Sequence, residues 1–116
     1  MGISYGGIGE WCATFGCGKV KEGDVVKVSA NGSADVCSAG DSFCGVVRAI
    51  AHDGKACSVQ LGGIATVNYS GENAPIPGYG KLSADAAGGV SVDASKGREY
   101  LILAADSAAK TVTIKL

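Results

Sequence analysis

The sequence predicts an all-β protein, a small barrel or sandwich made of two degenerate β repeats. Runs of β-prone residues alternate with turns marked by many of the 19 glycines. Only 6% of residues are aromatic, so the core must consist mainly of Val, Ile, Leu and Ala. The second half also repeats the first, because Gly23 and Gly78 are separated by the same number of residues as Leu61 and Leu116.

Residues 1–18 are predicted to form an irregular, glycine-rich N-terminal arm that precedes a single β domain over residues 19–116. The arm shows neither helical nor strand periodicity. It carries three large rings, Tyr5, Trp11 and Phe15, which either fold back onto the barrel or dock on a neighbour. These three residues are the candidate contacts with partners, and deletion of the arm is expected to leave a folded domain.

The first repeat is expected over residues 19–69. Asn31-Gly32 and His52-Asp-Gly-Lys55 are turn sequences of the hairpin type. Cys57, Val59 and Leu61 alternate with polar or small residues, the period of a half-buried strand. The strands expected in this repeat cover 24–30, 34–38, 43–51, 56–61 and 64–69.

The second repeat is expected over residues 76–116, after a linker over 70–77 that contains both prolines. Its last strand places Val112, Ile114 and Leu116 on one face. Many short strands with closely spaced turn signals indicate a small barrel or sandwich. The strands expected here cover 81–84, 90–93, 99–105 and 110–116.

Charge and chemistry favour a non-catalytic role. A net charge of −1 argues against a nucleic-acid partner, and no apolar run is long enough to span a membrane. The single histidine, His52, lies in a predicted turn. Asp24, Asp41 and Asp53 each lie beside a glycine, where aspartate typically bonds its own backbone. We therefore assign no catalytic, cofactor-binding or metal-binding residues and expect no enzyme activity.

The five cysteines lack the spacing of a zinc knuckle. Cys37, Cys44 and Cys57 fall in predicted strands and are interpreted as small core residues, whereas Cys12 and Cys17 are open to oxidation. The N-terminus has no secretory pattern, so synthesis in the cytoplasm is expected.

Three segments in order carry a resemblance to a known family: Gly23-Asp-Val-Val, Ala39-Gly-Asp-Ser-Phe-Cys-Gly-Val-Val47 and Val59-Gln-Leu-Gly-Gly-Ile-Ala-Thr-Val67. This layout resembles the small decoration, or cement, proteins of bacteriophage and prophage capsids. The resemblance covers about residues 19–116 and implies a β-clip-like fold. It also implies a homotrimer on the outer surface of the virion that binds the major capsid protein and stabilises the shell, after synthesis in the bacterial host cytoplasm.

Three alternatives remain open. The same composition suits another virion part, such as a tail or spike domain. Lys21-Glu-Gly-Asp-Val-Val-Lys27 resembles the opening of a lipoyl or biotinyl carrier barrel, although residues 68–80 contain no lysine to modify. The third alternative is a metal- or redox-active protein that uses the five thiols.

Overall fold

The computed structural model describes residues 11–116, which form ten β-strands. No helix long and apolar enough to cross a membrane occurs in this part of the chain. The strands are β1 (Trp11–Cys17), β2 (Val25–Ala30), β3 (Ser33–Val36), β4 (Gly45–Ile50), β5 (Ala56–Gly62), β6 (Ile64–Ser70), β7 (Gly78–Ala84), β8 (Val90–Val92), β9 (Arg98–Asp106) and β10 (Thr111–Lys115).

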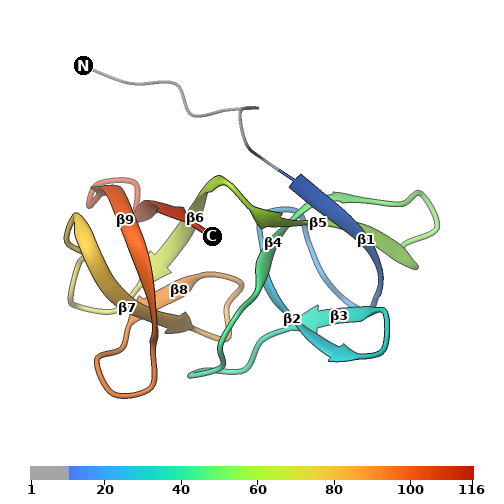
Figure 1. Ribbon diagram of the computed structural model, residues 1–116, viewed down its shortest axis with the longest axis horizontal. Helices are drawn as coiled ribbons and strands as arrows, with labels where there is room; N and C mark the ends of the chain where they lie inside the picture. The colour runs from blue at the N-terminus through green and yellow to red at the C-terminus, as the bar shows by residue number, and fades with distance from the viewer. Residues whose placement is uncertain (1–10) are drawn as a thin grey trace.

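The strands close into two five-stranded barrels that lie side by side (Figure 1). The first barrel has the strand order β1-β3-β2-β4-β5, and the second has the order β6-β8-β7-β9-β10. In each barrel the first strand runs parallel to the third, and every other pairing is antiparallel. The expected all-β fold and its internal repeat are therefore confirmed.

The two barrels also share an irregularity of strand pairing. The register between β4 and β5 shifts after Val47, which leaves Arg48 without a partner residue on β5. The register between β9 and β10 shifts in the same way and leaves out Leu103. Arg48 and Leu103 are separated by the interval that relates the two halves of the sequence, so each repeat carries a β-bulge at the equivalent position.

The expectation of an irregular arm over residues 1–18 is wrong for residues 11–17. These residues form β1, which pairs with β5 from Trp11 opposite Gly62 to Gly16 opposite Ala56. The side chain of Phe15 packs against the core of the first barrel. Strand periodicity is weak here because small residues occupy most positions, and pairing with β5 overrides that weak local signal.

The boundary between the repeats also differs from the expected one. The predicted strand at 64–69 is β6, which belongs to the second barrel and lies between β8 and β10. The structural repeats therefore cover residues 11–62 and 64–115. Gly63, at a φ of 89°, makes the turn between them. The buried Gln60 amide bridges this link, because its Nε2 donates hydrogen bonds to the carbonyls of Gly62 and Ile64.

A shared core holds the barrels together as one body. The larger hydrophobic cluster joins Phe43 and Val46 of the first repeat to the interior of the second barrel, whereas a smaller cluster fills the first barrel. The ring of Phe43 stacks on that of Tyr100 with centroids 4.7 Å apart, and the Tyr100 hydroxyl donates to the Phe43 carbonyl over 2.8 Å. Backbone bonds from Val25 to Gly88 and from Gly40 to Ala84 add to this contact.

Replacement of Tyr100 by phenylalanine tests this junction. Tyr100 is buried, so Tyr100→Phe keeps the stacked ring but leaves the Phe43 carbonyl without its donor. We expect the free energy of unfolding, measured by urea denaturation, to fall by about 1–3 kcal/mol. The control is Tyr79→Phe, because Tyr79 is exposed and its change should have no effect. Equal stability of the two variants would contradict the role given to this hydrogen bond.

Candidate interaction surface

The structure separates the three aromatic residues that the sequence offered as contacts. Trp11 begins β1 and is 59% exposed. Its indole covers Gly62 on β5 so closely that no side chain fits there. Phe15 is half-buried in the first barrel and stabilises its own fold. Tyr5 lies outside the described residues. Of the two that are described, Trp11 is the one available to a partner.

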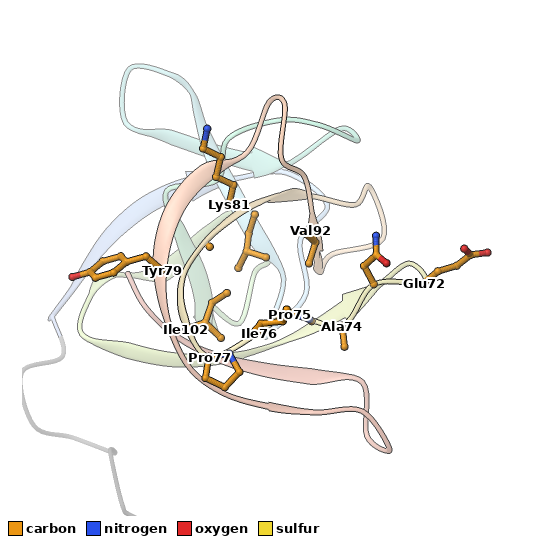
Figure 2. A pocket seen from close by; sticks show the side chains of 12 residues that line it. Glu72, Ala74, Pro75, Ile76, Pro77, Tyr79, Lys81, Val92 and Ile102 are labelled. Atoms are coloured by element: carbon orange, nitrogen blue, oxygen red, sulfur yellow. The ribbon is translucent and has the colours of Figure 1, made fainter.

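An apolar groove lies on the second barrel, between the β6–β7 connection and strands β7 and β8 (Figure 2). Its volume is about 580 Å³, within the range of binding pockets in proteins. Two of its lining side chains are among the most exposed apolar residues described, with Ile76 77% and Tyr79 73% exposed. Its apolar lining includes the side chains of Ala74, Pro75, Ile76, Tyr79, Val92 and Ile102.

Local sequence explains the shape of this groove, which we call the β6–β7 groove. Pro75 and Pro77 hold the connection in an extended form and have no N–H group to pair with a strand. Gly78, at a φ of 111°, turns the chain into β7. Gly80 has no side chain, and a Cβ there would come within 2.9 Å of Ile102 Cδ1. The groove therefore opens onto the edge of the buried core.

Charged residues lie only at the rim of this groove. Glu72 and Lys81 are both exposed. Figure 2 shows them well apart at the edge, with apolar side chains between them. The sequence analysis predicted a linker over residues 70–77. The sequence signal that could have indicated the groove is Ile76, an apolar residue between two prolines in that linker.

The aspartates act in turns, as expected. Backbone N–H groups of Lys21, Ser38 and Lys55 donate to the carboxylates of Asp24, Asp41 and Asp53, respectively. Asp41 also accepts a hydrogen bond from Lys27 Nζ over 2.6 Å. The bond from Lys27 and the one from the Ser38 amide lower the pKa of Asp41.

The cysteines are all free thiols. Burial raises the pKa of both Cys37 and Cys57 to about 11, so these thiols stay protonated and unreactive at neutral pH. Cys57 lies in β5 as expected, whereas Cys37 and Cys44 lie outside the strands, between β3 and β4. Cys12 is exposed on β1. No group of three or more metal-binding side chains occurs within residues 11–116.

No family model matches the chain. No curated protein matches it either. The fold and surface define the chain as a tandem double-barrel β protein with an exposed tryptophan at the start of its first strand and an apolar groove on its second barrel.

Proposed function

We propose that this protein is a structural component of a bacteriophage virion, a decoration protein that binds the outer surface of the capsid as a homo-oligomer, with a trimer expected. The observation that carries the proposal is the ordered set of segments that resembles this family. These segments occupy structurally defined places: Gly23-Asp24 leads into β2, Ala39–Asp41 lies at the junction of the barrels, and Gly45-Val-Val47 opens β4.

The second of these segments, Ala39–Asp41, connects the two barrels through main-chain hydrogen bonds. The Gly40 amide donates to the Ala84 carbonyl over 2.9 Å, and the Ala84 amide donates to the Asp41 carbonyl over the same distance. Gly40 has a φ of 87°, a conformation that favours glycine. The Gly-Asp turn therefore fastens the first barrel to the second and makes the tandem unit rigid. A rigid unit binds a shell with little loss of conformational entropy.

We assign binding to the capsid to the surface around Trp11. A large exposed aromatic residue on a rigid strand is a favoured anchor in protein interfaces. Several weak contacts of this kind add up when an oligomer binds a repeating lattice, because each further subunit binds at a high effective concentration. An oligomer that spans adjacent capsid subunits would thereby tie them together and stabilise the shell.

The test is binding to capsids of the phage or prophage whose genome encodes this chain. We expect the full chain to co-sediment with these capsids to saturation and to raise the temperature at which they disassemble. Trp11→Ala should weaken binding about tenfold or more, whereas Val28→Ala, a change at a comparably exposed residue of β2, should not. Absence of binding to capsids, or binding to tails instead, would overturn the proposal.

A further inference from the structure

We infer that Cys17 and Cys57 are a redox-sensitive modification site, because the structure places them to form a disulfide bond when the protein meets a peroxide. Both lie in the first barrel, where Cys17 ends β1 and Cys57 lies near the start of the neighbouring β5 (Figure 1). The inference goes beyond the proposed function, because it concerns a covalent change within one chain and requires no capsid.

The pairing of β1 with β5 directs the two thiols to the same side of the sheet. Phe15 lies opposite Cys57. The Cys17 amide donates to the Lys55 carbonyl over 3.1 Å, so Cys17 is the diagonal neighbour of Cys57 across the two strands. Because residues two apart on a strand share a face, Cys17 and Cys57 point the same way. Both accordingly belong to the hydrophobic cluster that fills the first barrel.

The position of Cys17 at the end of its strand makes bond formation possible. Diagonal neighbours are typically about 7–8 Å apart at Cα, whereas a disulfide usually spans about 4.4–6.8 Å. Only a small shift is needed, and Gly18 follows directly after β1. The Cys17 thiol donates to the Gly54 carbonyl over 3.7 Å, which holds its sulfur beside the turn from β4 into β5.

Exposure gives the two thiols different roles. Cys17 is half-buried, so an oxidant in solution can reach it, whereas Cys57 is only 2% exposed. Burial, with a smaller contribution from the Cys17 thiol beside it, raises the pKa of Cys57 to about 11 and protects it from reagents in solution. Cys57 can still attack an oxidised Cys17, because neighbouring groups within one molecule react at a high effective concentration.

The reaction has two steps, and hydrogen peroxide is the oxidant. The sulfur of Cys17 attacks one peroxide oxygen, the O–O bond breaks, and the departing hydroxide takes the thiol proton to form water and leave a sulfenic acid. The sulfur of Cys57 then attacks the sulfur of Cys17. The S–O bond breaks, and the departing hydroxide takes the Cys57 proton to form a second water. Two electrons pass in total from the two thiols to the peroxide.

The other three cysteines are placed differently. Cys12 lies on β1 opposite Gln60, on the face of the strand away from Cys17. Cys37 and Cys44 lie between β3 and β4, and Cys37 belongs to the core that the two barrels share. A bond between Cys37 and Cys44 is therefore the competing outcome, and Cys12 serves as the exposed control.

The bond would fasten β1 to the first barrel. It joins residues 17 and 57 and so restricts the unfolded chain more than the folded one. The cytoplasm keeps thiols reduced, whereas conditions outside the cell allow disulfides to persist. In the virion component proposed above, the bond would form after the particle leaves its host, and this timing alone rests on the proposed function.

The first experiment maps the disulfide in the purified full chain, without capsids. The reduced protein is treated with hydrogen peroxide at mildly alkaline pH, and its remaining thiols are alkylated. Digestion after lysine should give a disulfide between the peptides 1–19 and 56–81. The Cys12→Ser variant should give the same link, which assigns it to Cys17. A bond between Cys37 and Cys44, a bond through Cys12, or no disulfide would overturn the inference.

Thermal denaturation measures what the bond does to the fold. The full chain and Cys12→Ser should each melt about 5 °C or more higher after oxidation than before, and dithiothreitol should reverse the rise. Cys17→Ser should show no rise. Each variant is compared with its own reduced form, so a change of stability caused by the substitution itself does not affect the result. Equal rises in Cys12→Ser and Cys17→Ser would contradict the assignment.

Trapping of the intermediate tests the order of the two steps. In Cys57→Ala the sulfenic acid on Cys17 has no thiol to attack it, so dimedone should label Cys17, as identified by fragmentation of the peptide. In the control, Cys12→Ser, Cys17 should escape labelling once the disulfide has formed. Equal labelling of Cys17 in both variants would show that Cys57 does not react with it. None of these measurements uses capsids, so they can fail while the capsid-binding test succeeds, and the reverse also holds.

Discussion

Replacement of Ile114 by aspartate should unfold the protein. Ile114 is fully buried on β10, where it pairs with Ile102 and belongs to the core cluster that joins the two barrels. An unpaired carboxylate at this place costs several kcal/mol, which is comparable with the whole stability of a domain of about 5–15 kcal/mol. Circular dichroism and urea denaturation should show no cooperative transition for Ile114→Asp.

The control is the neighbouring residue on the same strand. Lys115 is exposed, so Lys115→Asp should change the free energy of unfolding by no more than about 0.5 kcal/mol. Val59→Asp tests the same expectation in the first barrel, because Val59 is the buried residue of β5 that is equivalent to Ile114. A soluble Ile114→Asp protein that unfolds cooperatively would show that the side chains of β10 point the other way.

Removal of β1 should destroy the first barrel, whereas removal of the segment before it should not. A chain that lacks residues 1–17 loses every pairing of β1 with β5 and β3, together with the packing of Phe15 and Cys17. We expect this chain to aggregate, because the exposed edges of β3 and β5 become free to pair with other copies. A chain that lacks only residues 1–10 keeps all these contacts and should melt within a few degrees of the full chain.

This expectation replaces the one drawn from sequence, in which deletion of residues 1–18 left a folded domain. Thermal denaturation followed by circular dichroism, with light scattering for aggregation, distinguishes the two. If the chain without residues 1–17 melts cooperatively at the temperature of the full chain, β1 is not needed to close the barrel.

The sequence predicted the repeat well because strong patterns carry it. Val59 and Ile114 alternate with half-buried or polar neighbours, and the equal intervals between matching residues appear in the structure as equivalent strands and equivalent bulges. Most predicted strands in residues 24–116 lie within a few residues of the observed ones. Turn residues such as Asp53 and Gly54 were predictable because their bonding is local.

The places where prediction failed depend on contacts between distant residues. Trp11–Cys17 is a strand because β5 lies beside it, and neither its composition nor its periodicity indicates this. Ile64–Ser70 was predicted as a strand, but only its pairing with β10 shows which barrel it joins. The β6–β7 groove was missed for the same reason, because its floor includes Ile102, which lies far along the chain from Ile76.

Closure of both sheets restricts how copies of this protein can associate. In the part of the chain that the structure describes, each barrel strand has a neighbour on both sides. Main-chain groups that could extend a sheet into another molecule are therefore confined to stretches that pair on one side alone, such as the part of β1 before Gly16. Association of copies then depends mainly on side-chain contacts, which a single substitution can strengthen, weaken or redirect.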